Sequence, residues 1–236
     1  MSIAPYYNIE SIRLWDEEEI NFREIAIKQL SSTVKRTLTN VNPAWKITRV
    51  EGPILIPGNM ISESYSDDDI FQTQVIKAGK MICLRPETTM SSYAWAKMNL
   101  TSKRLPYCVW QAGKSFRVEK LDGASASKLR FNEFWQLEFQ CIYSNSTMAD
   151  YRSKLIEAVA HDIRWLLFNN IVRIVESDRL PEYSESTIDI EALHIGNYRE
   201  VASCSIRKDY DADTKVCEIA IGLDRLVEIW NSIRDK

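Results

Sequence analysis

The pattern of hydrophobic and polar positions predicts a long helix near the N-terminus. Within residues 16–40, apolar residues recur at a spacing that suits one face of an amphipathic helix. Acidic residues fill its first turn, where the helix dipole favours them, and Pro43 is expected to follow its end. Residues 45–50 then alternate as a strand does, and Pro53 and Pro57 restrict that strand to the edge or the end of a sheet.

The remaining pattern predicts strands interrupted and followed by helices. Residues 61–80 are polar and acidic and predict an exposed turn. A loop of small residues, 122–125, is expected to join the first two of the long strands. The predicted strands are 105–119, 131–143, 187–193, 198–206 and 217–221, and the predicted helices are 88–99, 147–176 and a last one from Leu223. Without an internal repeat or a linker, the sequence predicts one α+β domain over residues 1–236, an antiparallel β-sheet flanked by helices.

Composition narrows the class of protein. With 45% hydrophobic and 27% charged residues, the 236-residue chain is typical of a globular protein and unlike a disordered or fibrous one. No apolar run approaches the roughly 20 residues of a membrane helix, so no membrane partner is expected. Five cysteines without a CxxC pair indicate a reduced, cytoplasmic chain. The mixed charges, net −3, do not indicate a strongly basic nucleic-acid-binding face.

Two of the predicted strands carry side chains suited to a nucleotide. Arg117 and Glu119 are two residues apart, so on a strand they share a face, as they would in an ordinary surface ion pair. A hairpin would add Arg130, Phe134 and Glu138 to neighbouring positions. Together these residues offer a planar fork for a phosphate, an acceptor for an amine and an aromatic face for a base.

Two helix starts also contain candidate residues. Arg225 follows Gly222 in a first helical turn, where an arginine can stack on a flat ring or meet a phosphate, although it is also common in ordinary helices. In residues 84–89, LRPETT, Pro86 and Glu87 suit the first turn of a helix, so this segment also reads as a helix cap.

Taken in order, these segments resemble the signature motifs of class II aminoacyl-tRNA synthetases. RVEGPIL and the long helix before it (16–57) resemble motif 1, which builds the dimer interface of that family. FRVE and the following EF (within 114–140) resemble motif 2, and AIGLDR (within 218–230) resembles motif 3. LRPET is similar to a segment of glycyl enzymes, whereas YREVASCS is similar to a strand of seryl enzymes. The resemblance is therefore to the glycyl, seryl, threonyl and prolyl subgroup and does not assign the amino acid.

The resemblance implies roles for individual residues. Arg117 would hold the α-phosphate of ATP and the amino acid's carboxylate, Phe134 and Arg225 would stack on adenine, and Arg117 and Arg225 are the expected catalytic residues. Glu119 would accept from the adenine amino group. The residues implied in ATP binding are Arg117, Glu119, Arg130, Phe134, Glu200, Ser203 and Arg225, of which Glu200 and Ser203 would also bind magnesium. The acids expected around the α-amino group of the amino acid are Glu87, Glu138 and Glu218.

The expected activity is ATP- and Mg²⁺-dependent formation of an aminoacyl-adenylate by a homodimer. The aminoacyl group would pass to the acceptor end of a tRNA or to a non-tRNA acceptor such as a carrier protein. The chain is expected to be a stand-alone catalytic core without an anticodon-binding domain. Asn132 and Ala220 stand where glycyl enzymes have Arg and Ser, which argues against a standard glycyl enzyme. A catalytically silent paralogue that acts as a binding or regulatory subunit is the alternative.

Overall fold

A mixed sheet organises the computed structural model, which describes residues 6–7, 12–61, 65–77, 79–99, 105–119, 128–178, 180–211 and 213–234. The strands of this seven-stranded sheet, from edge to edge, are β3 (Lys46–Arg49), β7 (Tyr107–Phe116), β8 (Glu133–Ser144), β12 (Thr214–Gly222), β11 (Asn197–Arg207), β10 (Ser184–His194) and β9 (Val172–Glu176). Neighbouring strands are antiparallel, except that the edge strand β3 lies parallel to β7.

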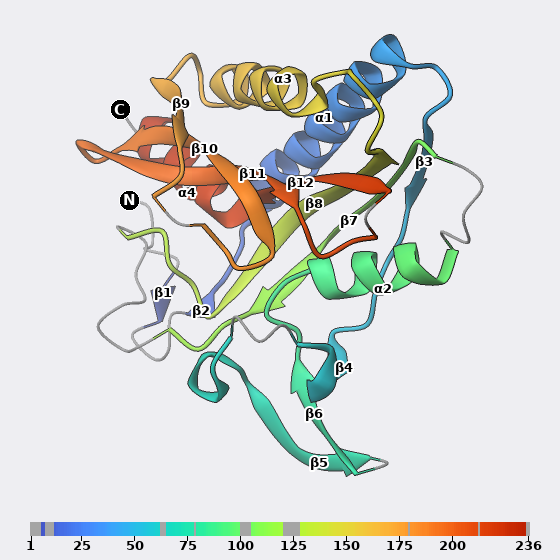
Figure 1. Cartoon of the computed structure of the whole chain (residues 1–236). Coiled ribbons are helices and arrows are strands. Elements are labelled where there is room, and N and C mark those ends of the chain that lie inside the picture. The colour runs from blue at the N-terminus through green and yellow to red at the C-terminus, as the bar shows by residue number, and fades with distance from the viewer. Residues whose placement is uncertain are drawn as a thin grey trace.

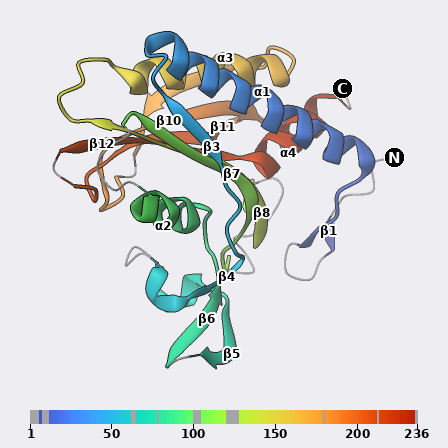
Figure 2. The same ribbon diagram turned by 90° about the vertical axis from the view of Figure 1, so that its right-hand side faces the viewer.

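Helices cover both faces of the sheet. They are α1 (Glu17–Val41), α2 (Thr89–Asn99), α3 (Tyr151–Leu166) and α4 (Leu223–Arg234). Figures 1 and 2 show α1 and α3 side by side across one face and α2 on the other. A small sheet of β4 (Leu55–Pro57), β6 (Lys80–Leu84) and β5 (Gln72–Lys77) projects beyond the main one, and the N-terminal strands β1 (Tyr6–Tyr7) and β2 (Ile12–Arg13) pair with each other.

The helix α1 forms where the hydrophobic pattern predicts it. A capping box starts it, because the Asp16 carboxylate accepts from the Glu19 backbone N–H while the Glu19 side chain accepts from the Asp16 N–H. Ala26, Leu30 and Leu38 are fully buried on its inner face, where α1 packs against α3. Each large apolar side chain buried in this way stabilises the fold by about 1.5–3 kcal/mol.

Alternation along the strands separates the apolar core from the polar residues. On β8, Leu137 and Phe139 point toward the helices α1 and α3 and join the main core. Gln136 and Glu138, between and beside them, point to the opposite face of the sheet, because successive side chains of a strand alternate. The central strands therefore carry a row of buried polar side chains on the face away from α1.

The main predictions for the fold are confirmed. The α+β class, α1, α2, the edge position of β3 and the long strands all occur, each within a few residues of the expected bounds. The exposed turn expected at 61–80 is an incomplete description. That stretch contains a 3₁₀ turn (Asp67–Asp69), β5 and the start of β6. The predicted loop 122–125 lies outside the described residues.

The predicted helix 147–176 is wrong over its last third, residues 167–176. The helix α3 ends at Leu166, and Phe168 and Asn169 then take positive φ angles of 52° and 63°, a left-handed conformation that ends helices. The chain turns back and forms β9, which pairs with β10 at the edge of the sheet. The β-branched residues Val172 and Ile174 suit this strand. The helical spacing of the apolar residues before them nevertheless led to the prediction of a helix.

Candidate active site

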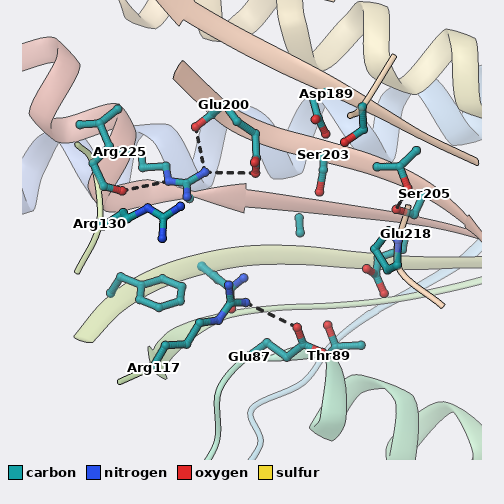
Figure 3. Close-up of a pocket in the computed structure, with 18 of the residues that line it drawn as sticks. Glu87, Thr89, Arg117, Arg130, Asp189, Glu200, Ser203, Ser205, Glu218 and Arg225 are labelled. Carbon is teal, nitrogen blue, oxygen red and sulfur yellow. Dashed lines mark hydrogen bonds and ion pairs between the residues drawn. The ribbon is translucent and has the colours of Figure 1, made fainter. Parts of the chain in front are cut away.

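One cavity of ≈ 380 Å³ lies against the polar face of the sheet. Its walls come from β8, β10, β11 and β12, from the first turn of α4, and from residues 65–89 next to the small sheet. Figure 3 shows the charged side chains converging on this cavity from several directions. Segments that are far apart in the sequence therefore contribute to a single site.

Arg117 lies at the exit of β7 and faces the cavity. Its Nε donates to the Pro86 carbonyl at 3.1 Å, and its Nη2 lies 3.6 Å from a carboxylate oxygen of Glu87. The guanidinium also lies over the rings of Tyr65 and Phe134, at 5.4 and 5.3 Å from their centroids. Burial opposes its charge, but Tyr65 and Glu87 outweigh it and raise the pKa of Arg117, so the group stays cationic.

Arg225 occupies the opposite side of the cavity, in the first turn of α4 (Figure 3). Its Nη1 donates to the carbonyl and the carboxylate of Glu200, at 2.9 and 3.1 Å, and its Nε donates to the Leu129 carbonyl at 3.2 Å. These three hydrogen bonds, to two residues, hold the guanidinium in place. Nearby, Arg130 pairs with Glu119 at 3.3 Å.

Acidic side chains gather at the other end of the cavity. Glu87, which is buried, accepts from the Tyr65 hydroxyl at 2.6 Å. Glu218, on β12, is also buried, pairs with Arg207 and accepts from the amide of Gln140. Burial is the largest cause that raises the pKa of Glu218, while Arg207 opposes this. This end of the cavity can therefore receive a small cationic group between fixed acids.

Glu138 lies behind that wall and does not line the cavity. It is fully buried, and one carboxylate oxygen accepts from the hydroxyls of Thr88 and Thr89, both at 2.8 Å. Its other oxygen accepts from Gln140 at 2.9 Å. Burial, followed by the charge of Glu218, raises the pKa of Glu138 to about 8. Its hydrogen bonds are with Gln140 and with Thr88 and Thr89 at the start of α2, and of these partners Thr89 lines the cavity.

Comparison with known proteins identifies the family. Residues 71–216 match the model of the tRNA synthetase class II core domain (G, H, P, S and T). The chain belongs to this family. The recognition of a class II core and the fold class expected from the sequence are thereby confirmed.

The class II core is similar to parts of longer proteins. The chain is 28% identical over 187 residues to the glycine–tRNA ligase of Mycoplasmopsis synoviae. This alignment covers 67% of this chain and 41% of that protein. The chain is 31% identical over 139 residues to the enzyme of Acetivibrio thermocellus, covering 55% and 29%. The chain thus spans less than half the length of the curated relatives it matches.

Solved prolyl-tRNA synthetases share the fold of this class II core. The enzyme of Cryptosporidium parvum, complexed with halofuginone and AMPPNP, has a TM-score of 0.73 at 14% identity, covering 96% of this chain and 50% of that one. The enzyme of Giardia lamblia, in complex with prolyl-adenylate, has a TM-score of 0.69 at 15% identity, covering 94% and 48%. At such identities the likeness concerns the fold.

The structure brings nearly all the predicted site residues of the class II core to one cavity. Those that line it are Glu87, Arg117, Glu119, Arg130, Phe134, Glu200, Ser203, Glu218 and Arg225. Glu138 is the exception, since it supports the wall from behind. The expected Mg²⁺ ligands, Glu200 and Ser203, both present oxygen atoms to the cavity, which is the donor type that Mg²⁺ prefers.

Several lining residues were not predicted from the sequence. Tyr65 and Tyr183 close the acidic end, and Asp189 lies on β10 opposite Ser203 of β11. Burial is the main cause that raises the pKa of Asp189 to about 6. The alternation of Thr187 and Asp189 among apolar neighbours was the signal available, since it places polar side chains on one face of a buried strand.

Within the described residues, no group of three or more His, Cys, Asp or Glu side chains could hold a metal ion. Among the described helices, none is long and apolar enough to cross a membrane.

Proposed function

We propose that this class II core uses ATP to activate an amino acid as an aminoacyl-adenylate. The observation that carries the proposal is that Arg117, Arg225, Phe134 and Glu119 line one cavity whose other end holds buried acids. These groups suit the parts of the two substrates: phosphates and base on one side, an α-ammonium on the other. A cavity of ≈ 380 Å³ is within the usual size of small-molecule sites.

The nucleotide would occupy the end near α4. Adenine would lie between Phe134 and Arg225, with Glu119 accepting from its exocyclic amine. The contacts of Arg225 with Glu200 and with the Leu129 carbonyl support this role, because they hold the guanidinium in position before the base arrives. A group fixed in advance loses little conformational freedom on binding.

Arg117 would act on the reacting atoms. A carboxylate oxygen of the amino acid would attack the α-phosphorus, the bond from that phosphorus to the bridging oxygen would break, and pyrophosphate would leave. Negative charge on the α-phosphate oxygens rises in the transition state, and the Arg117 guanidinium would stabilise it. Mg²⁺ on the triphosphate would neutralise further charge, and Glu200 and Ser203 are the residues that would hold it.

The amino acid would bind at the acidic end. Its α-ammonium would meet the carboxylates of Glu87 and Glu218, both of which line the cavity. Glu138 would help indirectly, because its bonds to Thr88 and Thr89 hold the chain next to Glu87. We further propose tRNA as the acceptor, which is supported by the similarity to glycine–tRNA ligases.

ATP–pyrophosphate exchange with each of the twenty amino acids tests the activation step. We expect exchange with at least one of them and a loss of about 10²-fold or more in Arg117→Ala, a size typical of losing a group that stabilises transition-state charge. Arg173→Ala is the matched control, because this exposed arginine lies on β9 outside the cavity and should leave exchange unchanged. Folded protein without exchange for any amino acid would refute activation and favour the silent binding subunit.

Acceptor and assembly need separate measurements. Transfer of labelled amino acid to total tRNA supports a tRNA acceptor, whereas transfer to a protein fraction would favour a carrier protein. A homodimer through residues 16–57 is also proposed, supported by the exposed Ile20 and Ile25 on α1 and by the edge position of β3. Ile25→Glu should then shift the sedimentation of the dimer toward the monomer, and a monomeric wild type would contradict the proposal.

A further inference from the structure

The ladder between β8 and β12 ends beside the nucleotide end of the cavity. Its last pair joins Gln136 to Gly222, after which the chain turns directly into α4 at Leu223. Among the strands of the described residues, none continues along β8 next to Trp135 and Phe134 on this side. The backbone of these two residues therefore needs another partner where the sheet stops.

Asp224 supplies that partner with its side chain. Its Oδ2 accepts from the Trp135 backbone N–H at 2.5 Å, across 89 positions of sequence. The Asp224 side chain is only 1% exposed, and the residue lines the cavity. Because Asp224 is buried, this hydrogen bond is shielded from competition with water.

This bond joins the sequence neighbours of the two residues that would enclose adenine. Asp224 is adjacent to Arg225 in α4, and Trp135 is adjacent to Phe134 in β8. The stem of Arg225 lies against Gly222, where an added Cβ would be 3.2 Å from the Arg225 Cδ. The backbone at Gly222 therefore helps to position Arg225, and Asp224 attaches this turn to β8.

We propose that Asp224 is a positioning residue of the nucleotide site, which fixes the distance between Phe134 and Arg225. The inference rests on the proposed function, because it assigns the space between these two side chains to adenine. Asp224 would act through Phe134 and Arg225 without contacting the reacting atoms.

A purely structural role for Asp224 is the alternative, and other contacts make the two separable. Arg23 of α1 lies over the Trp135 ring at 4.1 Å, and Phe22 stacks on Trp230 of α4 with centroids 4.7 Å apart. Both β8 and α4 are therefore also attached to α1. Loss of the Asp224 bond should loosen the site more than it loosens the fold.

The test measures the affinity for Mg²⁺-ATP by calorimetry in the full chain. We expect Asp224→Ala to weaken ATP binding about tenfold, while the amide oxygen of Asp224→Asn restores part of the loss. Asp211→Ala, an exposed acid in the turn between β11 and β12, is the matched control and should bind as wild type. If Asp224→Ala does not fold, Asp224→Ser takes its place, with the same expectation.

A double-variant cycle separates positioning from general support. In a Phe134→Ala background, Asp224→Ala should weaken ATP binding little further, because the Phe134 ring that faces Arg225 is already missing. Full additivity of the two losses, or wild-type affinity in Asp224→Ala, would overturn the positioning role while the proposed function stands. Absence of ATP binding by the wild type would overturn both together.

Discussion

Gly113 offers a sharp test of how the segment before α2 is held. A Cβ added there would lie 2.3 Å from Nη2 of Arg85, whose buried guanidinium fills the space beside the glycine. Arg85 donates from Nε to the Lys114 carbonyl at 2.8 Å and from Nη1 to the Gly52 carbonyl at 2.9 Å. It thereby joins the end of the motif 1 segment to β7 and to the residues that carry Glu87. We predict that Gly113→Ala strongly destabilises the protein.

The magnitude follows from the displacement that the new methyl group forces. A comfortable contact is about 3.5 Å, so the guanidinium must move by about 1 Å, which breaks both short bonds of a buried cation. Each such bond contributes about 1.5–3 kcal/mol, so losing both should lower the free energy of unfolding by about 3–6 kcal/mol. With a urea dependence of about 3 kcal/mol per M, the unfolding midpoint should decrease by about 1–2 M urea. Tryptophan fluorescence during urea unfolding measures it.

Two companion variants make the result interpretable. Gly58→Ala is the control, since its nearest neighbour would lie at 3.4 Å, an ordinary contact, and its midpoint should stay close to wild type. In an Arg85→Met background, Gly113→Ala should cost much less, because the obstructing guanidinium is gone. A midpoint of Gly113→Ala within about 0.3 M of wild type would refute the reasoning, as it would mean that Arg85 is free to leave without loss of stability.

Two further predictions concern buried titratable groups. Glu138 keeps its proton to a pKa of about 8 in the folded chain, against 4.5 as its ordinary value, so the folded state binds the extra proton between these values. Stability from this group is therefore lost as pH rises from about 5 to 8, by about 1.4 kcal/mol per unit, and Glu138→Gln should remove that slope from urea-unfolding data. All five cysteines are free and buried, so a dithionitrobenzoate reagent should label none in the native protein within minutes and five in guanidinium; rapid labelling of native protein would contradict their burial.

Much of the fold could be predicted because local patterns and packing agree. In α1, the apolar spacing, the acidic first turn and the following proline all indicate the same helix. The strand β8 alternates between the core and the polar face, so its period of two is readable without knowing its neighbours. The order of the strands could not be predicted in this way. In the sheet β12 pairs with β8, although α3, β9, β10 and β11 lie between them in the sequence. Nothing in the spacing of single residues encodes that long-range order.

The false helix after α3 shows where local patterns fail. Leu166, Leu167 and Ile171 continue an apolar helical spacing. The left-handed conformation of Asn169 ends the helix, and it is needed because the chain returns to the sheet. That requirement comes from the unpaired edge of β10, which is a tertiary feature. Periodicity therefore gave the wrong answer where a strand and a helix share the same apolar residues.

The site residues divide in the same way. Arg117, Phe134 and Arg225 stand in motifs whose order could be read from the chain, and the structure brings them to one cavity. Tyr65 and Asp189 stand in no such motif, and only the packing of the small sheet and of β10 brings them there. Glu138 was expected to contact the substrate, but its carboxylate is fully buried behind Thr88 and Thr89. This burial depends on the position of α2, which the sequence pattern does not give.

Charge pairing in the free cavity explains how a predominantly acidic wall could receive a polyanion. Each cation already faces an acid: Arg117 faces Glu87, Arg130 faces Glu119, and Arg225 faces Glu200. These pairs hold the guanidinium groups in place, but at 3.1–3.6 Å they are not short, and the side chain of each arginine is partly exposed. ATP would exchange partners with them, its phosphates replacing carboxylates while the amino acid's ammonium takes Glu87. Net affinity is then the difference between two sets of ion pairs, so removing an acid frees an arginine and removes a substrate contact at once.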